Sequence, residues 1–141
     1  MNITIRTCDG ADSERLRSSD VFDGPAQPEL IDDFFSRRGH HLIGAFDGED
    51  LIGFVSGIEV AHPDKPVEML LYELGVDESH RRRGIGRALV EALASHAVDQ
   101  GCSIMWVPLD AGDDIAHATY RSAGATTYED TGVMTWDLGR S

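Results

Sequence analysis

The sequence predicts a single α/β domain, in which helices flank a mixed and mostly antiparallel sheet. Three observations support this fold class. Short apolar or alternating segments recur along the chain, which is typical of strands. Two longer segments, 84–100 and 113–123, are expected to be helices, and in the first of them apolar residues recur at every fourth position. Strand patterns at 67–76 and 103–107 enclose the first of them, and this unit has the length of a right-handed crossover between parallel strands.

The first half of the chain contains three strand patterns and two helix patterns. Strands are expected over 3–8, 41–46 and 51–60, and helices over 11–20 and 29–38. Asp47-Gly48 separates the second and third strands and predicts a tight hairpin turn. Gly24 and two prolines interrupt the segment 22–28, which is therefore expected to be a loop.

The second half completes the predicted sheet. In the helix over 84–100 apolar residues recur at every fourth position, and Gly101 suits its C-terminal end. The other expected elements are a helix over 113–123 and strands over 67–76, 103–107, 125–128 and 132–138. The prediction is a sheet of about seven strands with about four helices, in one domain of residues 1–141.

The composition narrows the classes of function. Twenty-five acidic residues against twelve basic ones give a formal net charge of −13. Such a field repels nucleic acids and anionic membranes and attracts cations, so it reflects either solubility or a polycationic substrate. No apolar run reaches the length of a membrane span, and the N-terminus lacks a signal-peptide pattern, so we expect a cytoplasmic protein. The two cysteines and six histidines show no metal-ligand spacing, and no metal is expected.

One turn of this acidic chain is basic. Arg81, Arg82 and Arg83 are three of its twelve basic residues, and Gly84 and Gly86 follow them at the predicted helix start. A helix N-terminus presents unpaired N–H groups and about half a positive charge, and glycines let a phosphate approach the backbone. The pattern is neither a P-loop nor a Rossmann fingerprint. It predicts an anion site, with an exposed basic turn as the alternative.

This region resembles the acyl-CoA motif of the GNAT superfamily of N-acetyltransferases: strand 67–76 is followed by Arg81-Arg82-Arg83-Gly84-Ile85-Gly86-Arg87. Tyr120, shortly before Gly124, is similar to the second signature of that superfamily. The resemblance implies the GNAT fold, in which two parallel strands splay apart and acetyl-CoA, the co-substrate, enters the gap. The acetyl-CoA contacts that it implies are Leu74, Gly75, Val76, Arg81, Arg82, Arg83, Gly84, Ile85, Gly86 and Arg87.

Acidic residues and one tyrosine are candidates for the chemistry. An acceptor amine must lose a proton before or during attack, and Glu73 is expected to act as general base, directly or through water. The resemblance implies that Tyr120 points at the CoA sulfur, where it would protonate the departing thiolate. Alternatively, Glu73 pairs with an arginine and Tyr120 only packs. The acids expected to bind ammonium groups of the acceptor are Glu73, Asp110, Asp113 and Asp114, with helix capping as the alternative for Asp113.

These residues together resemble one branch, the class I (gentamicin-type) aminoglycoside 3-N-acetyltransferases. That branch has a similar tyrosine-acid-leucine strand, an H-R-R-x-G-I turn and a D-Y-G-D-D segment, in which this chain has Ala111 instead of tyrosine. The resemblance implies direct acetyl transfer, in a ternary complex, to an amine of a polycationic small molecule, and a homodimer. The alternatives are an acetyltransferase for peptide N-termini, lysines or a metabolite amine, and a CoA-binding module without turnover.

Overall fold

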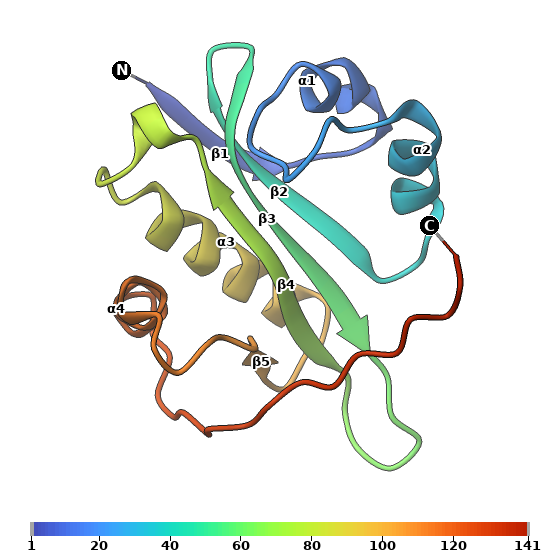
Figure 1. Cartoon of the computed structure of the whole chain (residues 1–141), viewed down its shortest axis with the longest axis vertical. Helices are drawn as coiled ribbons and strands as arrows, with labels where there is room; N and C mark the ends of the chain where they lie inside the picture. Colours follow the sequence, from blue (N-terminus) through green and yellow to red (C-terminus); the bar gives the residue numbers. More distant parts are fainter. Residues whose placement is uncertain (1, 141) are drawn as a thin grey trace.

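The computed structural model describes residues 2–140, which contain one mixed sheet with the strand order β1-β2-β3-β4-β5 (Figure 1). The strands are β1 (Ile3–Thr7), β2 (His40–Asp47), β3 (Asp50–Val60), β4 (Glu68–Val76) and β5 (Met105–Trp106). The helices are α1 (Ser13–Arg17), α2 (Pro28–Ser36), α3 (Ile85–Asp99) and α4 (Asp114–Ser122). β1 to β4 pair antiparallel and β5 joins β4 in parallel, which confirms the predicted α/β class with a mixed sheet. No helix within the described residues is long and apolar enough to cross a membrane.

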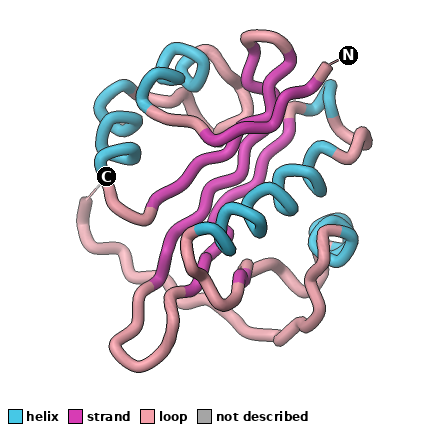
Figure 2. Tube along the Cα trace, turned by 180° about the vertical axis from the view of Figure 1, so that it is seen from behind, coloured by secondary structure: helices cyan, strands magenta, loops and turns pink. Residues whose placement is uncertain are grey.

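Each face of the sheet has its own apolar core. Helix α3 lies along one face (Figure 2), where Leu89 and Leu93 are fully buried in a cluster that includes Ile43 of β2. Helices α1 and α2 contribute to a second cluster, which includes Leu42 of the same strand. Because neighbouring residues of a strand point to opposite faces, the two clusters lie on opposite sides of the sheet. The helical periodicity of 84–100 therefore marked the face that packs on the sheet.

The parallel pair of strands is short. β4 and β5 are paired at two positions, Met69 with Met105 and Leu70 with Trp106. Beyond Leu70, this edge of β4 has no strand partner among the described residues. Backbone N–H and C=O groups that lack a strand partner need another one, so this edge is available to an extended ligand. The unit β4-α3-β5 is the crossover that the sequence predicted.

The prediction of seven strands is wrong, because residues 2–140 form five. The segments 125–128 and 132–138 were expected to be strands, and both are irregular. The apolar side chains of the second segment, from Val133 to Leu138, are between 74% and 84% exposed. An alternating pattern shows that a segment is suited to a strand, but a strand also needs an edge to pair with. Within the described residues this segment pairs with no edge of the sheet.

Candidate active site

An acidic cleft lies beside the C-terminal half of β4. It has a volume of about 650 Å³, and the loop between α1 and α2 forms its other wall. Among its lining residues one cation, Arg81, stands against five acids: Asp20, Asp23, Glu73, Asp77 and Glu78. A negatively charged cleft with low-dielectric walls concentrates cations from solution. The cleft is therefore suited to an acceptor that carries ammonium groups.

A β-bulge aims Glu73 into this cleft. In the pairing of β3 with β4, Ser56 lies opposite Glu73 and Gly57 lies opposite Leu71, so that Tyr72 is an extra residue. The buried hydroxyl of Ser56 accepts a 3.1 Å hydrogen bond from the backbone N–H of Glu73. In a regular strand, Glu73 would share a face with Leu71, which packs against α3. The extra residue releases Glu73 from that face and lets it line the cleft.

The surroundings of Glu73 favour its protonated form. Partial burial in the cleft, and then the negative charge of Asp23, raise the pKa of the Glu73 carboxyl above its usual range. A carboxylate with a raised pKa accepts a proton more readily at neutral pH, which is what a general base requires. The side chain that the sequence predicted as the base therefore lines the acidic cleft and has a raised pKa.

The loop that carries Asp20 and Asp23 rests directly on the sheet. The ring centroids of Phe22, in this loop, and Phe54, in β3, lie 4.5 Å apart. At Gly75 of β4, a Cβ atom would lie 2.9 Å from the carbonyl oxygen of Val21 and 2.9 Å from Cε1 of Phe54. Glycine at this position is therefore what allows the loop to approach β4, and the approach brings the acids of the loop to the cleft.

We expect Gly75→Ala to damage acceptor binding. The added methyl group forces the loop or Phe54 to move, at a cost of about 1–3 kcal/mol of stability. The loop acids then shift relative to Glu73, so KM for the acceptor should rise several-fold more than KM for acetyl-CoA. Steady-state kinetics in both substrates measure this difference. Gly10→Ala is the control, because a Cβ at Gly10 would meet no atom within 4 Å; an equal effect of the two variants would contradict the role of the contact.

The basic turn lies at the start of α3. Gly84 is the N-cap residue and has a left-handed φ of 77°, and Arg82 also has a positive φ, of 64°. No side chain caps the helix, so its first N–H groups are left for a ligand. A Cβ atom at Gly84 would meet no protein atom within 4 Å, so the approach to these donors is open. Glycine reaches this φ without strain and keeps the approach clear.

The turn, β4 and α4 meet at one place. Nε of Arg81 donates a 3.1 Å hydrogen bond to the carbonyl oxygen of Val76, the last residue of β4. A Cβ atom at Gly86 would lie 3.9 Å from Val76 and 3.7 Å from Thr119 of α4. Free backbone donors therefore adjoin a strand edge that lacks a partner. This arrangement fits the diphosphate and the amide-containing arm of acetyl-CoA.

Tyr120 follows Thr119 on α4 and stands beside this meeting point. It packs against the core on the α3 face. Burial, and then the charge of Asp113, raise the pKa of the Tyr120 phenol. The raised pKa keeps the hydroxyl protonated at neutral pH, which is the state that a proton donor needs.

Asp110, Asp113 and Asp114, which lie at or just before the start of α4, do not line the acidic cleft. The acids of that cleft come from the α1–α2 loop, from β4 and from the residues that follow β4. Asp113 is the N-cap of α4, and its carboxylate accepts a 3.0 Å hydrogen bond from the N–H of Ala116. Capping, the alternative interpretation of Asp113, is thus what the structure contains. Asp114 lies in the first turn of the helix, and the backbone carbonyl of Asp110 accepts a hydrogen bond from the N–H of Asp113.

Four acids of the cleft were missed by the sequence analysis: Asp20 and Asp23 of the α1–α2 loop, and Asp77 and Glu78, which directly follow β4. Asp20 and Asp23 flank the start of the irregular segment 22–28, where neither strand nor helix periodicity assigns a direction to a side chain. Their proximity to β4 depends on the contact at Gly75. A signal was nevertheless present, because Gly75 interrupts an apolar strand, and a glycine inside a strand often marks the close approach of another backbone.

His80 connects the basic turn to the β2–β3 hairpin. Its Nδ1 lies 3.0 Å from a carboxylate oxygen of Asp77, and its Nε2 lies 3.3 Å from one of Asp47. The Ser79 hydroxyl also donates to Asp77. Both ring nitrogens thus face carboxylates, which favours the doubly protonated imidazolium and raises the pKa of His80. The residue that follows is Arg81, the first of the basic turn.

We expect acetyl-CoA binding to depend on the charge of His80. At pH values below its raised pKa, the His80 imidazolium bridges Asp77 and Asp47 and so holds the basic turn to the β2–β3 hairpin. This bridge weakens as the pH rises through that pKa. KM for acetyl-CoA should therefore increase several-fold at alkaline pH in the wild type. In His80→Gln it should be higher than in the wild type at neutral pH and independent of pH. His62→Gln is the control, since His62 contacts Glu68 at the far end of β4; a wild-type pH profile in His80→Gln would exclude the bridge.

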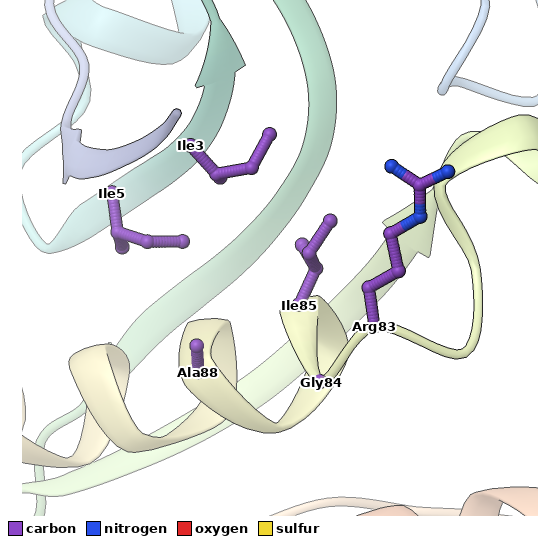
Figure 3. A pocket seen from close by; sticks show the side chains of 6 residues that line it. All are labelled: Ile3, Ile5, Arg83, Gly84, Ile85 and Ala88. Carbon is purple, nitrogen blue, oxygen red and sulfur yellow. The ribbon is translucent and has the colours of Figure 1, made fainter. Parts of the chain in front are cut away.

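A second hollow, of about 370 Å³, lies on the other side of the basic turn, between β1 and α3 (Figure 3). Figure 3 shows the side chains of Ile3 and Ile5 facing Ile85, with Arg83 at one end. Its lining residues are Ile3, Ile5, Arg83, Gly84, Ile85 and Ala88. None of them is acidic, so the hollow cannot neutralise an ammonium group. The acidic cleft is therefore the candidate acceptor site.

Comparison with solved structures supports the same fold. An aminoglycoside acetyltransferase from an uncultured soil metagenomic sample, solved with sisomicin, superimposes with a TM-score of 0.81 at 20% identity and covers 96% of each chain. Aminoglycoside N-acetyltransferase AAC(6')-Iy, solved with CoA, gives a TM-score of 0.75 at 19% identity and covers 99% of this chain and 96% of that one. At such identities the likeness concerns the fold.

Sequence comparison establishes the family. The N-alpha-acetyltransferase RimI of Mycobacterium tuberculosis (strain ATCC 25618 / H37Rv) is 30% identical over 126 residues, which are 86% of this chain and 77% of that protein. Residues 11–125 match the acetyltransferase (GNAT) family, and this range includes β4, the basic turn and α4. The protein therefore belongs to the GNAT family of acetyltransferases and is an N-acetyltransferase.

Proposed function

We propose that the protein transfers an acetyl group from acetyl-CoA to an amine of a cationic small molecule. The first candidate is an aminoglycoside antibiotic, acetylated at its 3-amino group. The observation that carries this proposal is the acidic cleft beside β4, in which Asp20, Asp23 and Glu73 line one space. Each charge-assisted hydrogen bond to an ammonium group contributes about 1.5–3 kcal/mol. Several acids in one cleft therefore favour an acceptor with several ammonium groups.

The proposed chemistry requires two proton transfers by this chain. Acetyl-CoA supplies the thioester. Glu73 takes the proton from the attacking amine, directly or through water, and Tyr120 gives its proton to the departing thiolate. The raised pKa of Glu73 suits acceptance of the proton, and the Tyr120 phenol carries a proton that it can donate.

Direct attack in a ternary complex is supported by the state of the cysteines. A covalent relay would require a thiolate as nucleophile. Burial raises the pKa of the Cys8 thiol to about 12, and burial also raises that of Cys102. Both thiols are thus held in the protonated form, which leaves direct transfer from acetyl-CoA to the amine as the proposed route.

Acetyl-CoA is proposed to bind along β4 and the basic turn. The backbone of the β4 edge forms hydrogen bonds with the amide-containing arm of acetyl-CoA. The backbone N–H groups of the turn donate hydrogen bonds to the diphosphate, and the arginine side chains neutralise the negative charge of the diphosphate. The residues assigned to this role are Leu74, Gly75, Val76, Arg81, Arg82, Arg83, Gly84, Ile85, Gly86 and Arg87. Asp110, Asp113 and Asp114 are proposed to contact more distant ammonium groups of a long acceptor, from the α4 side. We also propose that the protein acts in the cytoplasm and as a homodimer.

A second candidate acceptor is the α-amino group of a protein or peptide. It is favoured by the likeness to RimI, which is an N-alpha-acetyltransferase. Acylation of a lysine or of a metabolite amine would use the same groups, and a module that binds CoA without turnover would use only the turn. These alternatives differ in the charge and size of the acceptor, so an acceptor panel separates them.

The test measures free thiol released from acetyl-CoA in the presence of gentamicin, a linear polyamine, a peptide with a free N-terminus and a lysine peptide with a blocked N-terminus. Turnover of gentamicin with little turnover of the peptides is expected. Asp23→Asn should then raise KM for gentamicin more than KM for a monoamine. Efficient turnover of the free N-terminus alone would overturn the small-molecule proposal in favour of the second candidate. CoA binding without thiol release for any acceptor would overturn both.

A further inference from the structure

The apolar core requires an extra residue in β4 but does not determine which residue it is. Leu71 is fully buried on the α3 face, and Leu74, three positions later, packs against the same cluster. Because the side chains of a strand alternate between its two faces, one extra residue must lie between these two leucines. Either Tyr72 or Glu73 can be that residue while both leucines stay in the core, so a polar interaction must distinguish the two arrangements.

The facing part of β3 has no room to slide into a different pairing. Gly57 of β3 lies opposite Leu71. A Cβ atom at Gly57 would lie 2.8 Å from Sδ of Met69 and 2.9 Å from Cδ1 of Leu93. The β3 backbone therefore rests directly on core side chains of β4 and α3, and a close-packed interior resists a shift of such a segment. The position of the extra residue is thus decided within β4.

Ser56 of β3 supplies a hydrogen bond that distinguishes the two arrangements. The register places Ser56 opposite Glu73, and its hydroxyl oxygen accepts the hydrogen bond from the backbone N–H of Glu73 at 3.1 Å. A bulge interrupts the backbone ladder, so an N–H group at the bulge needs another acceptor. If Glu73 became the extra residue, its N–H would leave this hydroxyl and Ser56 would face Tyr72. The observed hydrogen bond therefore favours Tyr72 as the extra residue.

The surroundings of Ser56 give its hydroxyl no other task. Within residues 2–140 two polar or charged side chains are buried, Asp12 and Ser56, and Asp12 is paired with Arg6. The neighbours of Ser56 along β3 include the buried Val55. A hydroxyl buried among apolar groups costs free energy unless it is hydrogen-bonded, and the bond that the structure gives it among the described residues is the one at the bulge.

We infer that Ser56 is a positioning residue for Glu73: its hydroxyl holds Glu73, rather than Tyr72, in the paired position opposite β3. The inference rests on the proposed function, in which Glu73 takes the proton of the acceptor amine. Tyr72 and Glu73 both line the acidic cleft, so an exchange of their places would move the carboxylate away from the amine. Misplacement of a reacting group by about 1 Å costs about 10²-fold in rate.

Kinetics with gentamicin as acceptor test the positioning role. Ser56→Ala should lower kcat by about 10–10²-fold, because Glu73 loses its anchor. Ser56→Thr keeps a hydroxyl at the same place and should restore most of this loss. Ile58→Val is the control, because Ile58 pairs with Leu70 outside the bulge, so the variant removes a methyl group from the same strand without touching the hydrogen bond at Glu73. Equal losses in Ser56→Ala and Ile58→Val would overturn the inference.

A double-mutant cycle separates positioning from general damage to the sheet. If Ser56 acts through the Glu73 carboxylate, Ser56→Ala should change kcat by less than about twofold once Glu73→Gln is present. The same loss in both backgrounds would show that the serine only stabilises the strand and would overturn the inference. Should Glu73→Gln alone leave kcat at the wild-type value, the role of Glu73 in the proposed function fails. A low kcat in Glu73→Gln with a normal one in Ser56→Ala removes the positioning role alone.

NMR of the protein without acceptor or acetyl-CoA reports the position of the extra residue directly. In the wild type, NOEs should join the backbone protons of Ser56 and Glu73, and the Glu73 amide should be protected from hydrogen exchange. In Ser56→Ala, exchange of this amide should become at least about tenfold faster, and NOEs from residue 56 to Tyr72 should appear. NOEs that pair Ser56 with Tyr72 in the wild type, or an unchanged Glu73 amide in Ser56→Ala, would overturn the inference whatever the kinetics show.

Discussion

Glu73→Gln should lower kcat by about 10²–10⁴-fold while the affinity for acetyl-CoA stays close to that of the wild type. The amide keeps the size and the polar character of the carboxylate, and the backbone hydrogen bond to Ser56 is retained because it uses the N–H of residue 73. What is lost is the ability to accept a proton from the amine. Steady-state kinetics and calorimetry with acetyl-CoA measure the two quantities separately.

Two further measurements decide whether Glu73 acts as the base. Because its pKa is raised, kcat/KM of the wild type should fall as the pH falls through that value, and Asp23→Asn should move this fall to lower pH. Glu68→Gln, at the other end of the same strand, is the control and should retain full activity. A kcat near the wild-type value in Glu73→Gln would remove Glu73 from the role of base.

Gly84→Val should weaken acetyl-CoA binding by about tenfold or more, which corresponds to about 1.4 kcal/mol. The position is open in the protein, since no atom lies within 4 Å of a Cβ placed there. A branched side chain would instead occupy the approach to the free N–H groups at the start of α3, where the diphosphate is proposed to lie. The affinity for acetyl-CoA, measured by calorimetry, checks this expectation.

The matched control for this variant is Gly101→Val at the other end of α3. Gly101 also has a left-handed φ, of 84°, and a Cβ there would also meet no atom within 4 Å. Valine at either position therefore brings a similar backbone strain of about 1–2 kcal/mol. Similar losses of affinity in the two variants would show that strain alone is responsible and that the diphosphate does not bind at the turn.

Features that depend on neighbours in the chain could be predicted from the sequence. The apolar repeat of 84–100 gave the helix and its buried face, and the basic turn before it lies at the N-terminus of α3 as expected. Both depend on spacing within about twenty residues. The same holds for the hairpin at Asp47-Gly48, where β2 and β3 pair as predicted.

Features that depend on residues far apart in the chain could not be predicted from the sequence. The bulge at Tyr72 is visible only in the register between β3 and β4, yet it decides that Glu73 lines the cleft. Asp20 and Asp23 line the same cleft as Glu73 because the α1–α2 loop packs against Gly75. The segment 132–138 has the alternation of a strand, but whether it pairs depends on which edges are free.

For this protein the sequence by itself therefore determined the fold class, the family motif and the residues able to carry the chemistry. These follow from residue type, periodicity and local backbone freedom, which depend only on neighbouring residues in the chain. The tertiary structure alone decided how many strands the sheet contains, which acids share the cleft and which apolar side chains remain uncovered. These depend on packing between distant segments, and packing selects among local patterns that are equally suited to a strand or a loop.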